Sequence, residues 1–280
     1  MSLPSRYWQD LTWTEFAKLP SETIAILPVA SIEQHGPHLP VSVDSTLNEG
    51  ILQRSLELAP ADLPLLVLPI QKIGLSVEHI RFPGTLTLQP ETVLALWTDI
   101  GHSVARAGVR KLVIFNSHGG QPQVVDIVCR RLRIAHRMFA LAVSWFKLRR
   151  RRDAEDSLPE AERVHGIHGG AVETAMMMHL TPGLVRREAI ADFSSRWLAH
   201  EAQFEQLVPE GSVAFGWETQ DLHPSGAVGD ATLATPQMGA EIVENAAQAF
   251  VTLLQEVHRF DAQAFLQDGP DPALRVPVGR

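Results

Sequence analysis

Short apolar runs alternate along the chain with longer segments that have the spacing of amphipathic helices. Four of the runs are apolar at nearly every position, and they lie at residues 23–29, 65–68, 111–115 and 139–143. Continuous apolarity of this kind is typical of parallel strands that are covered on both faces. The pattern therefore predicts a mainly parallel sheet.

Segments with helical spacing separate these runs and follow them. One helix is expected to begin near Asp44 or Ser45, with Ser45 as its N-cap. The others are predicted at residues 90–107, 124–136, 171–180 and 240–260. Alternation of strands and helices predicts helices on both faces of the sheet. Because we find no internal repeat and no linker, we expect one α/β domain over residues 1–280.

Two histidines follow the predicted strands closely. His35 comes a few residues after the first apolar run, and His118 comes a few residues after the third, each in a loop that contains glycine. In open α/β folds, ligands bind in the crevice beyond the carboxyl ends of the strands. Two strands therefore deliver an imidazole to the same edge of the sheet, and we expect the functional site there.

The first polar cluster follows the first apolar run. Glu33, His35 and Asp44 lie within a dozen residues, and they offer the oxygen and nitrogen ligands that zinc or manganese prefers. Glu33 and His35 are two residues apart, so an extended segment would point both to one side. The alternative interpretation is a polar loop whose histidines cap backbone groups.

Two further glycine-rich loops carry similar chemistry. The run Asn-Ser-His-Gly-Gly at 116–120 follows the third strand, and glycine there lets the backbone approach a ligand. His168 precedes a predicted helix whose first turn holds Glu173. Taken singly, the first is also compatible with an ordinary βα turn, and Glu173 with a residue that complements the helix dipole. The combination of three such loops favours a functional site.

Composition narrows the classes of partner. The chain has 24 Lys and Arg against 32 Asp and Glu, a formal net charge of −8, which argues against nucleic acid or an anionic membrane surface. Cys129 is the single cysteine, so neither an intrachain disulfide nor a thiolate metal cage is expected. The sequence shows no signal segment and no apolar stretch long enough to span a bilayer. We therefore expect a cytoplasmic protein without a membrane partner.

In this order, the three loops resemble the creatininase (creatinine amidohydrolase) family. Further matches are residues 74–79 leading to 82–87, and residues 224–230 leading to 234–235. Together the motifs cover roughly residues 10–255. The resemblance implies a three-layer α/β/α sandwich with a mainly parallel central sheet. It also implies a homo-oligomer, often a hexamer.

The resemblance further implies a metal-dependent amidohydrolase with two divalent ions per chain, zinc, manganese or both, with iron(II) as a further option. By similarity, Asp44 would bridge the ions, Glu33 and His118 would complete one site, and His35 and a further glutamate the other. A water or hydroxide between the metals would attack an amide or cyclic amide C–N bond of a small molecule. His168 would transfer the proton, a role that suits a histidine with a pKa near neutrality.

The chain departs from the creatinine-hydrolysing members at two places. Those members read approximately Asn-Gly-His-Tyr-Glu-Asn at the second loop and take their last metal ligand from that glutamate, where this chain has Gly120. Other branches use the glutamate of the His-Gly-Gly-x-x-Glu-Thr motif, so we assign that role to Glu173. Trp145 matches one of two aromatic residues around the creatinine ring, but Val164 replaces the other. We expect Trp145, Gly119 and Gly120 to contact a small amide other than creatinine.

Several activities stay open on the same scaffold. They are a deformylase for a pyrimidine nucleotide, a peptidase, and a hydrolase of a cyclic sugar-derived carbonyl compound. A non-catalytic, metal-dependent sensor of a small molecule is the rival from another class. Glu78 is interpreted as a loop ion-pair partner, and His38 and His79 as donors that orient metal ligands or as structural histidines.

Overall fold

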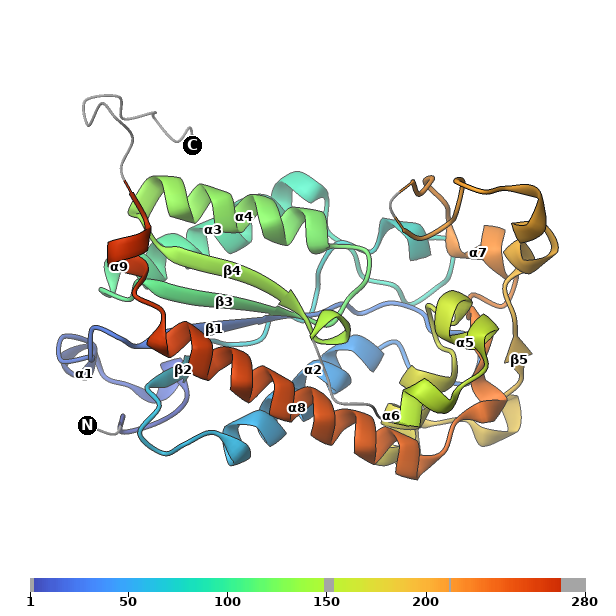
Figure 1. Cartoon of the computed structure of the whole chain (residues 1–280), viewed down its shortest axis with the longest axis horizontal. Coiled ribbons are helices and arrows are strands. Elements are labelled where there is room, and N and C mark those ends of the chain that lie inside the picture. Colours follow the sequence, from blue (N-terminus) through green and yellow to red (C-terminus); the bar gives the residue numbers. More distant parts are fainter. Residues whose placement is uncertain (1–2, 149–153, 212, 268–280) are drawn as a thin grey trace.

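A four-stranded parallel sheet lies at the centre of the computed structural model, which describes residues 3–148, 154–211 and 213–267 (Figure 1). The strands are β1 (Ile24–Val29), β2 (Leu65–Val67), β3 (Lys111–Asn116) and β4 (Phe139–Ser144). Their order is β2-β1-β3-β4, and every neighbouring pair is parallel. The predicted sheet is confirmed.

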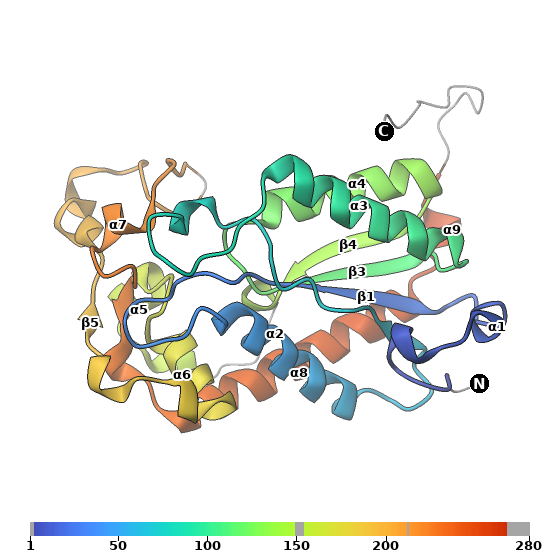
Figure 2. The same cartoon turned by 180° about the vertical axis from the view of Figure 1, so that it is seen from behind.

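Helices cover both faces of this sheet. The long ones are α2 (Val43–Leu58), α3 (Pro90–Arg106), α4 (Pro122–His136), α6 (Ala171–Leu180) and α8 (Pro236–Arg259). Both views place α3 and α4 on one face and α2 and α8 on the other (Figures 1 and 2). This is the three-layer α/β/α sandwich that the resemblance implied.

The core is divided by the sheet into two layers. Successive residues of a strand point to opposite faces, so Leu27 packs with Trp97 of α3 in one cluster. Ile26 packs in the other cluster with Phe250 of α8. All four side chains are fully buried. The alternation fixes the register of β1 and, with it, the direction in which the loop after β1 leaves the sheet.

Shorter helices and strands complete the fold. They are α1 (Trp13–Phe16), α5 (Glu160–His165), α7 (Thr219–Leu222), α9 (Ala262–Phe265) and the antiparallel pair β5 (Asp192–Phe193) and β6 (Gly229–Asp230). The segment from α5 to α7 gathers beyond the carboxyl ends of the strands (Figure 1). Within the described ranges, no helix has both the length and the apolarity to cross a bilayer.

Three helices, α2, α4 and α8, begin earlier than the apolar pattern predicts, and α4 begins at Pro122 rather than at residue 124. α2 begins at Val43, with Ser42 in the N-cap position, so the prediction of Ser45 as the cap is wrong. The Ser45 hydroxyl instead donates a hydrogen bond to the Ser42 carbonyl at 3.0 Å. α8 begins at residue 236. The hydroxyl of Thr235, its N-cap residue, accepts a hydrogen bond from the backbone N–H of Met238 in the first turn. The earlier start of α2 places Asp44 in its first turn, where a carboxylate is favourable.

Candidate metal centre

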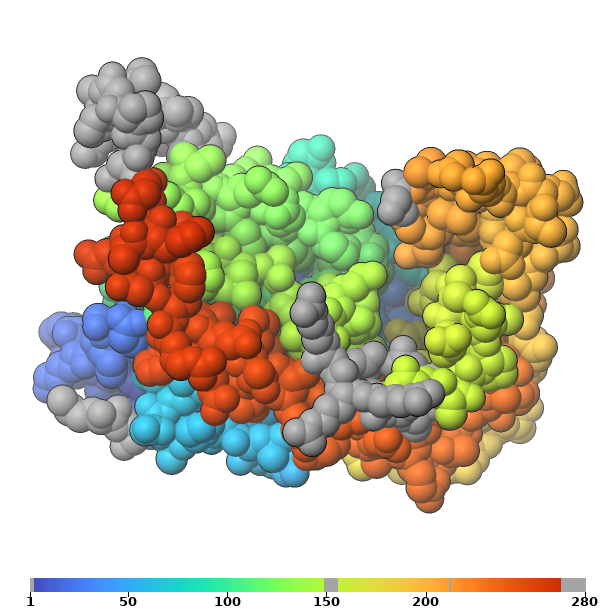
Figure 3. All heavy atoms as spheres, in the orientation of Figure 1, coloured from blue at the N-terminus to red at the C-terminus, as the bar shows by residue number. Residues whose placement is uncertain are grey.

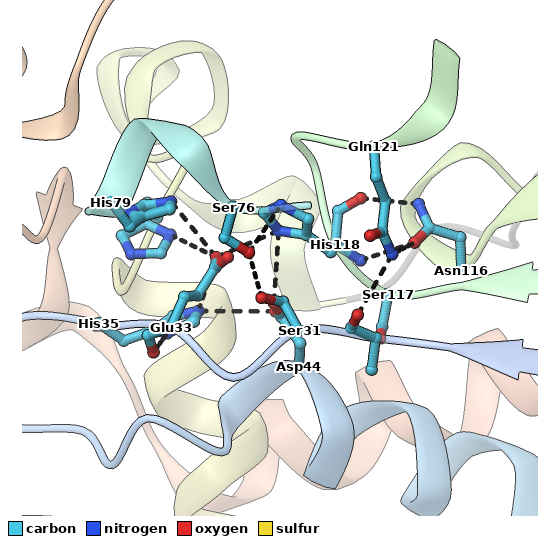
Figure 4. Close-up of polar contacts among 12 residues, drawn as sticks. Ser31, Glu33, His35, Asp44, Ser76, His79, Asn116, Ser117, His118 and Gln121 are labelled. Atoms are coloured by element: carbon cyan, nitrogen blue, oxygen red, sulfur yellow. Dashed lines mark hydrogen bonds and ion pairs between the residues drawn. The ribbon is translucent and has the colours of Figure 1, made fainter. Parts of the chain in front are cut away.

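All five side chains predicted to bind metal lie together beyond the ends of β1 and β3, and Figure 4 shows four of them, Glu33, His35, Asp44 and His118. Glu33 and His35 come from the loop after β1, Asp44 from the first turn of α2, and His118 from the loop after β3. These four are at most 2% exposed. Glu173, in the first turn of α6, is 18% exposed at its side chain. The predicted meeting of the loops is confirmed, whereas the ligand roles stay predictions.

Asp44 lies between the two imidazoles of this group. Its Oδ1 is 3.6 Å from His35 Nε2, and its Oδ2 is 3.4 Å from His118 Nδ1. Glu33 Oε1 is 3.1 Å from His118 Nδ1, and Glu173 Oε2 is 3.7 Å from His35 Nε2. The cluster therefore has two halves that share Asp44, which is the placement a bridging carboxylate requires.

The polar atoms of the cluster fit a divalent cation. Among the described residues, Glu33 Oε2, His35 Nε2 and Asp44 Oδ2 are buried and make no hydrogen bond of acceptable geometry. Leaving a buried polar atom unsatisfied costs about 1–3 kcal/mol, and more when it is charged. Carboxylate oxygens and imidazole nitrogens without other partners are the donors that zinc and manganese accept. These three atoms of the cluster, Glu33 Oε2, His35 Nε2 and Asp44 Oδ2, are thus placed to contact an ion.

Each imidazole at the centre is anchored by its other ring nitrogen. His35 Nδ1 donates to the Glu33 carbonyl at 3.0 Å, His118 Nε2 to the Leu75 carbonyl at 2.8 Å, and His168 Nε2 to the Gln34 carbonyl at 2.6 Å. A carbonyl accepts only N–H, so these contacts assign the tautomers. In each ring the remaining nitrogen faces the cluster and, once deprotonated, can offer its lone pair to an ion, as is usual for metal-binding histidines.

The charges of the cluster are strongly coupled without metal. Burial opposes the charged ring of His35, but Glu173, Asp44 and Glu33 outweigh it and raise its pKa to about 9. Burial raises the pKa of Glu173 to about 7 against the opposing effect of His35. Burial works against the ionised form of Asp44, yet its contacts with His118 and His35 lower its pKa. The metal-free centre therefore stores protons that an ion would displace.

We expect metal binding to release protons and to tighten as the pH rises toward about 9. Near neutral pH, His35 holds a proton and Glu173 holds part of one. An ion needs both groups deprotonated, so its apparent affinity rises until His35 loses its proton. Calorimetric titration with Zn²⁺ or Mn²⁺, in buffers that differ in ionisation enthalpy, counts the protons released at each pH. Equal affinity across this range without proton release would contradict the expectation.

His168 lies inside the cluster rather than at its rim. Its ring stacks between His35 and His79, with centroids 4.0 Å and 4.2 Å away. Its Nδ1 is 3.8 Å from Glu33 Oε1. Burial, and next the charge of His35, lower the pKa of His168 well below its usual value. This shift favours the neutral ring in the absence of an ion, with Nδ1 facing the cluster as a possible proton acceptor.

The sequence left the roles of His79 and His38 open. His79 Nε2 lies 3.3 Å from Glu33 Oε1, and its Nδ1 is 2.8 Å from the hydroxyl of Thr219 (Figure 4). His79 can therefore contribute to the centre directly. His38 Nε2 instead contacts the Thr174 hydroxyl at 2.9 Å, which ties the loop after β1 to α6. His38 is a structural histidine.

Glu162 is a residue that the sequence analysis missed. Its carboxylate accepts from the N–H of Ala171 at 2.7 Å and from the N–H of Asp230 at 2.6 Å. It thereby caps α6 from α5, nine residues earlier, in the manner of an N-cap side chain. Since Glu173 lies in the same first turn of α6, Glu162 helps to fix the carboxylate that faces His35.

A cavity of about 700 Å³ opens onto the centre. Its floor includes Glu33, Asp44, His118 and His168, and its lining includes all three predicted substrate contacts: Trp145, Gly119 and Gly120. Figure 3 shows the hollow between the green body of β4 and α4 and the yellow and orange segments after α5. Other lining residues are Val164, Phe215, Trp217, Lys147 and Arg163. The cavity is large enough for a substrate of substantial size to reach the candidate metal-binding residues.

The fold and the site define an α/β/α protein with a buried carboxylate–imidazole centre that suits divalent metals. The family model described as Creatininase: creatinine amidohydrolase matches residues 9–254. The chain belongs to the creatininase family and is a hydrolase, as the motifs predicted.

Relatives and solved structures agree with this membership. The chain is 32% identical to the mycofactocin precursor peptide peptidase of Mycobacterium tuberculosis (strain CDC 1551 / Oshkosh), over 81% of this chain and 82% of that protein. It is 31% identical to the creatinine amidohydrolase of Pseudomonas putida, over 65% and 75%. A crystal structure of creatininase aligns with a TM-score of 0.73 at 28% identity, over 92% and 99%. A structure described as Creatininase Mn aligns with a TM-score of 0.72 at 25% identity, over 91% and 100%.

Proposed function

We propose that this chain hydrolyses a C–N bond of amide type with two divalent metal ions in the centre described above. The observation that carries the proposal is the position of Asp44, which turns one oxygen to each half of a cluster whose buried atoms lack partners. Glu33 and His118 would hold one ion, and His35 and Glu173 the other. Zinc and manganese are the proposed ions, supported by the carboxylate and imidazole donors and by a solved relative described as a manganese form.

When bound, two such ions supply an acidified water and a polarised carbonyl at neutral pH. The chain's own residues would hold and move the proton. His168 Nε2–H is fixed by the Gln34 carbonyl, so Nδ1 is the atom that accepts a proton in the cavity. Returning that proton to the leaving nitrogen turns a poor leaving group into an amine. The buried rings around His168 exclude bulk water from this transfer.

The substrate we propose is an amide larger than creatinine, with a peptide as the leading candidate. A cavity of about 700 Å³ lies within the range of sites for drug-sized ligands. Lys147 and Arg163 line it and can pair with a carboxylate such as a peptide terminus. Val164, on the same lining, offers no flat wall for a creatinine ring. The similarity to a peptide peptidase supports this candidate over a small cyclic amide.

Metal content is the first test of the two-metal proposal. Protein purified without chelators should hold two equivalents per chain, and Glu173→Ala should hold about one, because its carboxylate is the one nearest His35 after Asp44. Elemental analysis of both proteins measures this. Glu160→Ala, which removes an exposed glutamate from the first turn of α5, is the matched control and should keep both ions.

The substrate class is tested once the metal state is known. Creatinine, short peptides with a free carboxyl terminus and the same peptides amidated should be compared at saturating metal. Faster cleavage of the free acids would support the peptide proposal. Preference for creatinine would overturn it, and one equivalent of metal or none in the reconstituted wild type would overturn the two-metal site. Binding of an amide without turnover would favour the sensor.

A further inference from the structure

Besides the five predicted ligands and the imidazoles of His79 and His168, a further carboxylate approaches the centre from the loop after β2. Glu78 lies in the turn Val77–His79, and its side chain is 13% exposed. Its Oε1 is 3.3 Å from His118 Nε2 and 3.9 Å from His79 Nε2. It also lines the cavity. No motif or spacing in the sequence places this carboxylate at the site, and Glu78 was interpreted there as a loop ion-pair partner.

Gly120 provides the space that this carboxylate occupies. A Cβ atom added at Gly120 would overlap Glu78 Oε1 and would lie 2.6 Å from His118 Nε2. The same atom added at the neighbouring Gly119 would meet nothing within 4 Å. A side chain at position 120 would therefore displace the Glu78 carboxylate from its present position beside His118. In this chain the side chain beside His118 comes from the loop after β2.

The atoms around Glu78 have the spacing of a ligand set. One ligand atom each from Glu33, Glu78 and His118 lies within 4.8 Å of the others. Two ligand atoms at a tetrahedral ion, with bonds of about 2.0–2.2 Å, are about 3.3–3.6 Å apart. Glu78 Oε1 lies beside Nε2 of His118, whereas Glu33 Oε1 lies beside Nδ1, so the Glu78 side chain would have to turn toward Nδ1 for all three residues to hold one ion. Glu78 would also add a fourth carboxylate to those of Glu33, Asp44 and Glu173, so that the carboxylate charge equals that of two divalent ions.

We propose that Glu78 is a metal ligand of this chain and completes the half of the centre held by Glu33 and His118. The proposal rests on the two-metal function proposed above. It assigns to Glu78 a role in metal binding, whereas Glu173 serves the opposite half, beside His35.

The test compares Glu78→Gln with the wild type, read by metal affinity and by the visible absorption spectrum of the Co²⁺-substituted protein. Glutamine keeps the size of the side chain and removes its charge. We expect the affinity for one of the two ions to fall by more than about 100-fold, because even residues that only orient ligands cost about 10–100-fold. The Co²⁺ bands should shift, since one ligand is lost. Glu210→Gln removes an equal charge from the lining of the same cavity and should change neither reading.

Three results would overturn the assignment. Unchanged metal affinity and an unchanged Co²⁺ spectrum in Glu78→Gln would show that Glu78 does not bind metal. The proposed function would still hold if the wild type bound two ions and hydrolysed an amide. A weaker affinity with an unchanged spectrum would make Glu78 a residue that orients His118. If Glu210→Gln lowered the metal affinity as much as Glu78→Gln does, the effect would come from the net charge of the cavity and not from a lost ligand. Failure of the wild type to bind two ions would instead count against the proposed function.

Discussion

An Asp44→Asn protein is expected to bind neither metal ion tightly and to lose hydrolytic turnover. Asp44 turns one oxygen to His35 and the other to His118, and it is 2% exposed. Asparagine keeps the shape, but it removes the charge and turns an NH₂ donor toward one half of the cluster. Residues that only orient a ligand cost about 10–100-fold in metal affinity. Loss of the shared carboxylate should therefore cost more than about 100-fold at each ion, measured as equivalents retained after dialysis and as kcat.

The matched control is Asp126→Asn on α4. Asp126 is paired with Arg130, and its side chain is 55% exposed, so this variant should keep both ions and full activity. Circular dichroism and thermal unfolding of the metal-free proteins would show that Asp44→Asn still folds. Two tightly held ions in Asp44→Asn would contradict the bridging role. Loss of one ion alone would place Asp44 in a single half of the centre.

The sequence was sufficient to predict which strands deliver the site. Continuous apolar runs identified β1 and β3, and parallel strands in one sheet end at the same edge. His35 and His118, each a few residues past its strand, therefore had to meet. The identification of the two strands and the meeting of the two histidines could both be predicted from the strands and the loops that follow them, without knowledge of any other part of the chain. The roles of Asp44 and Glu173 came instead from the family resemblance, and the structure places each in the first turn of a helix that begins at this edge.

The contributions that were missed come from segments without a hydrophobic period. Glu78 and His79 lie in a short turn of the long connection between β2 and α3, and no spacing rule states where such a loop passes. Glu162 caps α6 from another helix, a contact between residues that no local motif relates. The pKa of His168 depends on the burial of three stacked rings, which the sequence could not supply.

The structure also explains why Gly120 is informative only in three dimensions. In the sequence it marks a ligand missing relative to the creatinine-hydrolysing members, and the resemblance to other branches of the family assigned that role to Glu173. In the fold, its missing Cβ leaves room for Glu78 beside His118. A glycine can thus be needed because a distant side chain occupies the space of a Cβ atom, as well as because the backbone turns there.

At saturating metal, His168→Ala is expected to keep both ions while kcat falls by about 10²–10⁴-fold, the usual contribution of a proton-transfer group. The ring is fixed through Nε2 by the Gln34 carbonyl, and its Nδ1 faces Glu33 at 3.8 Å. Alanine removes that acceptor but none of the five predicted ligands. His165→Ala, three residues earlier and paired with Glu201, should change neither quantity.

The pH dependence separates a proton carrier from a ligand. His168 works as a base only when neutral, so activity is lost as the pH falls through its pKa. Because burial holds that pKa well below the usual value, the acid limb of kcat at saturating metal should lie below about pH 6.5. The residual activity of His168→Ala should lack this limb. Loss of an ion in His168→Ala would make His168 a ligand, and full activity at every pH would remove it from the reaction.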